Sequence, residues 1–126
     1  MVIITSVNKL VVAALIKNPE GQVLAVHLNK EKPEGVWVMP GGKLEDGESA
    51  RDCVVREAKE ELGIDIRPLK LAGICEVDYP SGSWVFLYYQ SEIVSGTPTP
   101  REEGKTLEAK YIDPQELHEY QKIVWF

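Results

Sequence analysis

Three glutamates crowd one short stretch of the chain, REAKEELG, at residues 56–63. If the stretch is helical, Glu57 precedes Glu60 by three positions and Glu61 by four, and residues at those spacings are neighbours on one helix face. Each like-charge pair costs about 0.2–0.5 kcal/mol on an exposed helix, so we expect a cation to offset the repulsion. Clustered carboxylate oxygens are typical ligands of hard divalent cations. The alternative interpretation is a solvated acidic helix face that binds nothing.

The residues around the cluster predict a helix over 49–62. Ser49 is a favourable N-cap with Asp52 three residues after it, and Gly63 is a usual C-terminal stop. At about 100° per residue the helix carries one apolar stripe, made of Ala50, Val54, Ala58 and Leu62. The glutamates project beside this stripe, close to the core on which the helix is expected to lie.

Neighbouring residues favour a ligand site over a bare acidic surface. Glu48 stands just before the helix, and Arg56 can reach back across one turn to brace carboxylates. The tripeptide Pro40-Gly41-Gly42 lies upstream, and glycine allows the backbone to approach a ligand closely. We therefore predict that the glutamates bind a divalent cation.

With these residues in view, GKLEDGESARDCVVREAKEELGI, residues 42–64, resembles the Nudix box. That motif is a glycine, five residues, glutamate, seven residues, arginine-glutamate, an aliphatic, any residue, two glutamates, any residue, glycine and an aliphatic. The fixed positions that match are Gly42, Glu48, Arg56, Glu57, Glu60, Glu61, Gly63 and Ile64. Ala58 replaces a larger aliphatic at a packing position. The preceding GVWVMPGG and the order of predicted elements also fit, so the resemblance covers nearly the whole chain.

The resemblance implies a Nudix hydrolase, which cleaves a nucleoside diphosphate linked to another group and uses Mg²⁺, with Mn²⁺ as a substitute. The positions that match the family's metal ligands are Glu57, Glu60 and Glu61. Glu48 and Arg56 match its structural and orienting pair. Carboxylates that hold Mg²⁺ would neutralise phosphate oxygens and position a deprotonated water, as pyrophosphate cleavage requires.

The same resemblance extends to the flanking segments. The backbone of Gly41 and Gly42 matches the loop that approaches the metal and the phosphates. The general base is either a glutamate of the box or one from the later segment TPREEGKTLEAKYI, where we favour Glu103 over Glu102 because of its usual distance before the next strand. The alternative for that segment is a polar loop without a catalytic role. The rival function for the chain is a catalytically silent Nudix-fold module that senses a nucleotide or binds a partner.

The remaining sequence predicts a single α/β domain over residues 1–126, an α/β/α sandwich of the Nudix type with a mixed β-sheet. Strands are predicted at residues 9–18, 22–29, 35–40, 64–79, 83–94 and 107–112. We expect the first two to form a hairpin around PEG and residues 41–48 to form a loop. Residues 113–122 should form a second helix, with Asp113 as its cap and Pro114 at its first position.

Composition narrows the class of protein. With 126 residues, 44% of them apolar and 27% charged, the chain has an ordinary globular composition. Its net charge of −6 argues against polymeric nucleic acid as a partner and is compatible with a small nucleotide bound through metal ions. No apolar run approaches the ~18 residues that a membrane span needs, and the first residues lack a signal-peptide pattern. Cys53 and Cys75 favour a reducing, cytoplasmic compartment, although they could form one disulfide.

The substrate is left open by the sequence. Pro80, sixteen residues after Ile64, resembles a marker of relatives that cleave ADP-ribose. GTPTPREEG, residues 96–104, resembles a loop of relatives that hydrolyse oxidised nucleoside triphosphates. Aromatic side chains that either stack on a base or fill the core are Trp37, Trp84, Phe86 and Tyr88. Weaker candidates for substrate contacts are His27, Lys43 and Arg101.

The C-terminal residues IVWF, 123–126, are all apolar. They either fold back onto their own sheet or help form a two-fold homodimer, the commonest closed assembly. We favour the homodimer, because large aromatic side chains left in water form a patch of the kind that monomers avoid.

Overall fold

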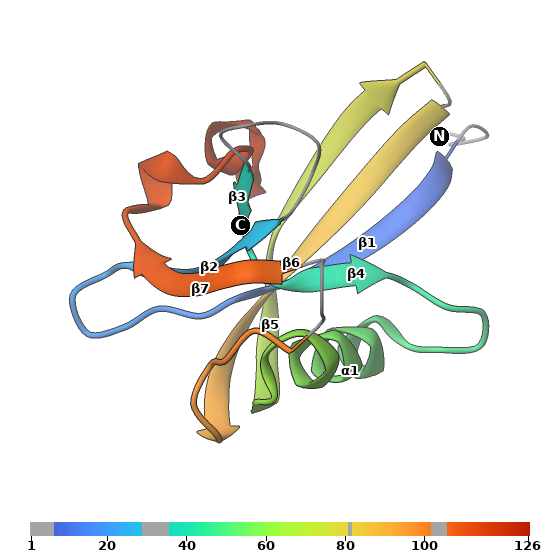
Figure 1. The fold of residues 1–126 in the computed structure, drawn as a ribbon. Coiled ribbons are helices and arrows are strands. Elements are labelled where there is room, and N and C mark those ends of the chain that lie inside the picture. Colours follow the sequence, from blue (N-terminus) through green and yellow to red (C-terminus); the bar gives the residue numbers. More distant parts are fainter. Residues whose placement is uncertain (1–6, 29–35, 81, 102–105) are drawn as a thin grey trace.

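The computed structural model describes residues 7–28, 36–80, 82–101 and 106–126 and shows two β-sheets with one α-helix (Figure 1). The elements in chain order are β1 (Val7–Leu15), β2 (Val23–Leu28), β3 (Val36–Val38), β4 (Gly41–Lys43), α1 (Ala50–Leu62), β5 (Asp65–Tyr79), β6 (Gly82–Ser95), β7 (Thr106–Ile112) and β8 (Val124–Trp125). The larger sheet has the order β4-β1-β6-β5-β8, and the smaller has the order β3-β2-β7. Within the described residues, no helix is long and apolar enough to cross a membrane.

The larger sheet is mixed, as predicted. Strands β1 and β6 run parallel, whereas β4 and β8 pair antiparallel with their neighbours. Strands β5 and β6 form a long antiparallel hairpin that closes between Tyr79 and Gly82, where the strands predicted at residues 64–79 and 83–94 meet. The α/β class and the mixed sheet are therefore confirmed.

The predicted hairpin of the first two strands is right only at its turn. The chain reverses tightly, with a bridge between Lys17 and Val23 and a hydrogen bond of 2.9 Å from the Leu24 amide to the Ile16 carbonyl. The strands then separate into different sheets. The reason is that β4 and β6 occupy both edges of β1, which leaves no edge for β2.

The predicted loop over residues 41–48 is also partly wrong, because its first three residues form β4. Gly41 pairs with Ala13 and Lys43 pairs with Val11. A Cβ atom on Gly41 would lie 2.3 Å from the Val12 carbonyl oxygen. The glycine that suggested an irregular loop is thus what allows this strand to lie against β1.

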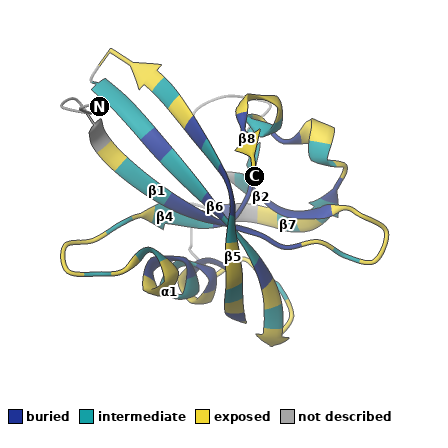
Figure 2. Cartoon of the chain, turned by 180° about the vertical axis from the view of Figure 1, so that it is seen from behind, coloured by how far each residue is buried: buried dark blue, intermediate teal, exposed yellow. Residues whose placement is uncertain are grey.

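The two faces of the larger sheet support two separate cores, because side chains alternate along each strand. From β1, Val12 and Ala14 pack on the side of α1, whereas Ala13 and Leu15 pack on the opposite side. Figure 2 shows the buried residues gathered where the strands cross, with α1 on one side of that crossing. The strand β4 lies next to α1 at the edge of the sheet (Figure 1).

The second helix predicted at residues 113–122 is wrong. The segment contains two short 3₁₀ turns, Pro114–Glu116 and Tyr120–Lys122, although the Asp113 carboxylate does cap the first by accepting from the Gln115 amide at 3.0 Å. Its apolar residues are spaced by three, at Leu117, Tyr120 and Ile123. Leu117 and Ile123 each follow a 3₁₀ turn in extended backbone. Both are buried, and Tyr120 packs against the same core, so the chain reaches this core through two separate short turns.

The C-terminal residues fold back onto their own sheet as β8. Trp125 pairs with Gly73 of β5, and the Phe126 amide donates to the Ala72 carbonyl at 2.9 Å. Ile123 is buried, but Val124 and Phe126 remain 62% and 74% exposed. The homodimer stays a prediction.

Candidate active site

The helix α1 begins and ends where the sequence predicts. The Ser49 hydroxyl accepts a hydrogen bond of 3.0 Å from the Asp52 amide, and Gly63 adopts a left-handed conformation with φ of 69°. The stripe residues Val54 and Leu62 are fully buried. The helix is therefore fixed in rotation, which determines where its glutamates point.

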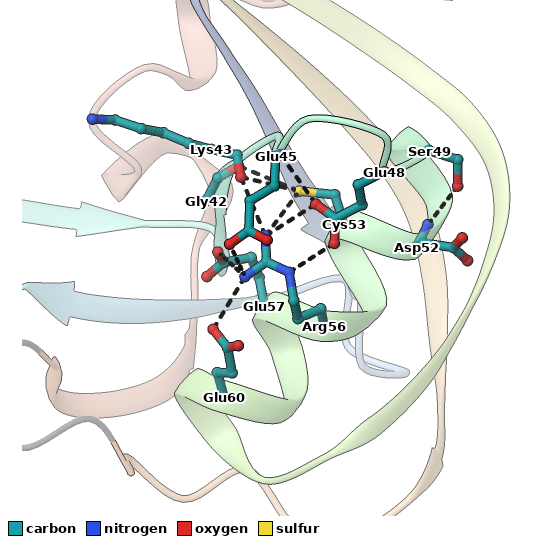
Figure 3. Close-up of polar contacts among 10 residues, drawn as sticks. All are labelled: Gly42, Lys43, Glu45, Glu48, Ser49, Asp52, Cys53, Arg56, Glu57 and Glu60. Atoms are coloured by element: carbon teal, nitrogen blue, oxygen red, sulfur yellow. Dashed lines mark hydrogen bonds and ion pairs between the residues drawn. The ribbon is translucent and has the colours of Figure 1, made fainter.

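Arg56 is the centre of the polar network on this helix (Figure 3). Its guanidinium donates two hydrogen bonds to the Glu48 carboxylate, 2.7 Å from Nε to Oε2 and 3.1 Å from Nη2 to Oε1. The hydrogen bond from Arg56 lowers the pKa of Glu48 from 4.5 to about 2, and the same bond raises the pKa of Arg56. A forked pair of this kind fixes geometry as well as charge.

The same guanidinium also binds the glutamates of the helix. Nη1 of Arg56 lies 2.9 Å from Oε1 of Glu57 and 3.2 Å from Oε2 of Glu60, and 3.6 Å from Oε1 of Glu45. Carboxylates that would repel each other thus share one cation. Arg56 thus compensates the charges of Glu57 and Glu60.

The other partner of the glutamates is the backbone of β4. Glu61 is 5% exposed, and its Oε1 accepts a hydrogen bond of 2.8 Å from the Gly41 amide. A Cβ atom on Gly42 would lie 2.3 Å from the carboxylate carbon of Glu57. The absence of a side chain at Gly42 therefore allows Glu57 of α1 to approach this strand closely. The role predicted for the Gly41–Gly42 backbone toward metal and phosphates stays a prediction.

The carboxylates of Glu57, Glu60 and Glu61 are chemically suited to bind a divalent cation. Within the described residues, no group of three or more acidic, histidine or cysteine side chains is arranged so that it could hold a metal ion as it stands. However, Glu57 and Glu60 both direct an oxygen at the guanidinium of Arg56. Carboxylate oxygens that converge in this way are also the ligands that Mg²⁺ prefers. Because Mg²⁺ keeps several of its waters, an incomplete protein cage is sufficient.

The C-terminal end of α1 accepts hydrogen bonds from the backbone of residues 99 and 101. The Thr99 amide donates to the Leu62 carbonyl at 3.0 Å, and the Arg101 amide donates to the Glu61 carbonyl at 2.9 Å. These bonds satisfy carbonyl groups that a helix end leaves without partners. Glu102 and Glu103 follow directly but lie outside the described residues. The side chain of Arg101 packs over Gly63.

A cavity of about 520 Å³ opens on the face of the larger sheet opposite α1. Its lining comes from β1, β3, β4, the β5–β6 hairpin and the 3₁₀ turns. The lining residues are Val11, Ala13, Val36, Val38, Met39, Gly41, Gly42, Lys43, Tyr79, Trp84, Phe86, Tyr88, Leu117, His118, Glu119, Tyr120 and Ile123. Strand β4 belongs both to the acidic site and to the cavity. Its Gly41 amide binds Glu61 of α1, and its residues line the cavity.

Aromatic rings form one wall of this cavity. Trp84 and Phe86 stack with centroids 6.2 Å apart, and Tyr79 meets Trp84 edge-on at 5.4 Å. The ammonium group of Lys43 lies 5.4 Å above the Trp84 ring. Tyr88 is buried at the base of the same row, where burial raises the pKa of its hydroxyl. Of the predicted stacking residues, Trp84 and Phe86 thus line the cavity with partly exposed rings, and Tyr88 lines it as a buried residue.

Two other predicted residues lie outside the cavity lining. Trp37 stacks on His27 with centroids 4.8 Å apart, and the ammonium group of Lys110 lies 4.7 Å from the Trp37 ring. This group is on the smaller sheet, across strands β2, β3 and β7.

Sequence reasoning missed several residues of the site. Glu45 joins the Arg56 network, and Cys53 places its Sγ 3.5 Å from the Lys43 carbonyl oxygen. Glu119 lines the cavity but falls in a segment predicted as an outer helix. Glu45 is one of the five unspecified residues between Gly42 and Glu48 of the box motif, so the motif does not distinguish it. Nothing local distinguishes Glu119.

A family model described as the NUDIX domain matches residues 7–125. The chain belongs to the Nudix family. It is 31% identical over 105 residues to the 8-oxo-dGDP phosphatase NUDT18 of Danio rerio, an alignment that covers 82% of this chain and 31% of that protein. It is 39% identical over 82 residues to the Nudix hydrolase YvcI of Bacillus subtilis, which covers 60% of this chain and 52% of that protein.

The solved structures agree on the Nudix fold. The MutT protein of Methanosarcina mazei superposes with a TM-score of 0.77 at 23% identity, over 95% of this chain and 91% of that one. The chain spans between about a third and a half of the length of the two curated relatives.

Proposed function

We propose that this protein is a pyrophosphohydrolase that uses Mg²⁺, with Mn²⁺ as a substitute, to cleave a nucleoside diphosphate linked to another group. The observation that supports this most directly is that the carboxylates of Glu57 and Glu60 converge on the guanidinium of Arg56, beside the glycine backbone of β4. Membership of the Nudix family gives the same class of reaction. The adjoining aromatic cavity offers space for the nucleoside.

In this proposal the metal ligands are Glu57, Glu60 and Glu61. A divalent cation bound there supplies charge neutralisation for phosphate oxygens and acidifies a bound water. Arg56 orients Glu57 and Glu60 and is itself held by Glu48. These contacts pre-position the carboxylates, so that little reorganisation is needed when substrate arrives.

The chain's own contacts also explain how two parts of a substrate could be held. The amide of Gly41 is fixed by Glu61, which sets the position of the β4 backbone between helix and cavity. Lys43 stands at the same strand above Trp84, where its ammonium group can meet a phosphate oxygen of a nucleotide whose base lies in the cavity. Glu103 is proposed as the group that accepts the proton of the attacking water.

The test is hydrolysis of a panel of nucleotides in Mg²⁺ and in EDTA. The panel contains nucleoside triphosphates, oxidised (d)NTPs, ADP-ribose, NADH, dinucleoside polyphosphates and nucleotide sugars. Metal-dependent release of a nucleoside monophosphate or of phosphate supports the proposal. The absence of turnover on every substrate, with nucleotide binding retained, would instead support a silent sensing module.

We further propose a cytoplasmic location. Cys53 and Cys75 are both free and buried, and free thiols persist in reducing compartments.

A further inference from the structure

We infer that a second, smaller cavity on the larger sheet binds a small aromatic phosphate ester, with Lys17 and Lys70 holding its phosphate group. The volume of this smaller cavity is about 240 Å³. Its lining residues are Leu15, Lys17, Lys70, Ala72, Gln90, Tyr120, Trp125 and Phe126. None of them belongs to the proposed metal site, so the inference does not rest on the proposed function.

The polar side chains of the smaller cavity come from three neighbouring strands or their ends. Gln90 of β6 pairs with Leu15 of β1 on one side and with Lys70 of β5 on the other. Lys17 stands two positions beyond Leu15, just past the end of β1. Because neighbouring strands lie about 5 Å apart, the two lysines flank Gln90, and their long side chains can meet one anion between them.

The charges of these two lysines are not compensated within the part of the chain that the structure describes. Both side chains are exposed, and neither forms an ion pair, a hydrogen bond or a cation–π contact with a described residue. No acidic side chain is among the residues that line the smaller cavity. Several other cations do meet a carboxylate, a carbonyl oxygen or an aromatic ring, namely Lys43, Arg51, Arg56, Lys59, Arg67 and Lys110.

This lack of compensation points to an anion as the ligand. The chain as a whole carries a net charge of −6, so two uncompensated ammonium groups beside one cavity form a local exception. The side-chain amide of Gln90 lies between them and adds a neutral donor. Phosphate oxygens accept from several donors at once, and lysine binds phosphate as a point charge.

Aromatic rings supply another part of the lining. Trp125 and Tyr120 pack with ring centroids 5.2 Å apart. The Phe126 amide donates to the Ala72 carbonyl at 2.9 Å, which holds the end of the chain against β5. Phe126 is 74% exposed and Trp125 is 36% exposed, so both rings have surface that a ligand can cover. Such rings favour another ring, stacked or edge-on.

The volume favours a ligand with one ring and one charged group. Cavities that enclose drug-sized ligands measure roughly 300–1,000 Å³, and this one is smaller. Inorganic phosphate would leave the rings of Trp125 and Phe126 uncovered, whereas a neutral ring would leave both lysines uncompensated. A phosphate group attached to a single aromatic ring satisfies both parts of the lining.

Binding of phenyl phosphate in EDTA tests the inference without metal and without hydrolysis. Titration calorimetry at low ionic strength should show saturable binding with a Kd on the order of 0.1–1 mM. Inorganic phosphate lacks the ring and phenol lacks the charge, so each should bind at least about tenfold more weakly. The two probes thus test the aromatic and the cationic parts separately.

Single substitutions locate the bound ester. Lys17→Gln and Lys70→Gln should each weaken phenyl phosphate by about tenfold, and both side chains are exposed, so the fold should be retained. The matched control is Lys9→Gln, which removes the same charge from an exposed position of β1 that does not line the smaller cavity. It should leave the Kd unchanged. Phe126→Leu should weaken phenyl phosphate but not inorganic phosphate.

The inference would be overturned by the absence of saturable binding or by equal affinities for phenyl phosphate and inorganic phosphate. An equal loss in Lys9→Gln and Lys70→Gln would also overturn it, because the net charge of the protein would then attract the ester. An unchanged Kd in both Lys17→Gln and Lys70→Gln would place the ester elsewhere, with the same consequence. None of these measurements involves turnover, so their failure leaves the proposed hydrolysis intact.

Discussion

Replacing Arg56 by alanine should destabilise the fold through the carboxylates that it leaves behind. The side chain of Arg56 is 24% exposed, and its partners Glu48 and Glu57 are each 14% exposed. Removing one member of a buried ion pair typically costs 3–5 kcal/mol, so for this partly solvated network we expect a loss of about 2–4 kcal/mol. For a domain of this size that corresponds to a fall in Tm of roughly 8–16 °C.

The matched control is Arg51→Ala on the same helix. Arg51 is exposed and donates to the Pro68 carbonyl at 2.9 Å, but it touches none of the glutamates. Its loss should cost no more than about 1 kcal/mol.

Thermal unfolding of both variants, with and without Mg²⁺, is the assay. Mg²⁺ should recover part of the stability lost in Arg56→Ala, because a second cation can then compensate Glu57 and Glu60. A Tm for Arg56→Ala equal to that of the wild-type protein, or a loss no larger than that of Arg51→Ala, would show that Arg56 does not stabilise the fold through these carboxylates.

The remaining predictions use the same network and the described cysteines. Because the pKa of Glu48 is lowered from 4.5 to about 2, its stabilising contribution is present above pH 4.5 and is lost as the pH falls toward 2. Urea unfolding should therefore show the difference between wild type and Arg56→Ala shrinking over that range, and a constant difference would contradict it. Burial raises the pKa of Cys53 to about 12 and also raises that of Cys75, so neither thiol should react with a disulfide reagent at pH 8 until the protein unfolds. Rapid reaction of the native protein would show that this packing is wrong. Glu103→Gln should lower kcat by roughly 10²–10⁴-fold with an unchanged Tm if Glu103 is the general base. An unaltered kcat would return that role to a glutamate of the box.

The parts of the fold that local chemistry determines were predictable from the sequence. The helix α1, its cap at Ser49 and its stop at Gly63 follow from residues within one turn of each other. The β5–β6 hairpin follows from two long strand-like runs around a short turn. In both cases the information lies within a few residues, and the structure adds only the packing.

The errors occur where distant residues decide the outcome. The pairing of β2 depends on whether β1 has a free edge, and that depends on β4 and β6. The segment 113–122 carries a good helix start, yet its backbone becomes extended at Leu117, where that side chain is buried in the core. Strand β4 consists of two glycines and a lysine, which have no strand preference of their own.

The candidate site also has a part that was predictable from local sequence and a part that was not. Its acidic half was predictable because Glu57, Glu60 and Arg56 lie on one helix at meaningful spacings. Its cavity half was not, because Trp84 and Glu119 come together only when the 3₁₀ turns pack on the larger sheet. A strand aromatic has the same sequence pattern whether it fills a core or lines a cavity.

We propose that the carboxylates on α1 hold the metal for pyrophosphate cleavage. The most direct measurement is the binding of Mn²⁺ by electron paramagnetic resonance, together with hydrolysis of the best substrate, for wild type and Glu60→Gln. Glu92→Gln is the matched control, because Glu92 is an exposed glutamate on β6 that pairs with Arg67. We expect Glu60→Gln to lose both Mn²⁺ affinity and nearly all turnover, whereas Glu92→Gln should keep both. Wild-type Mn²⁺ affinity and turnover in Glu60→Gln would show that Glu60 is not a metal ligand.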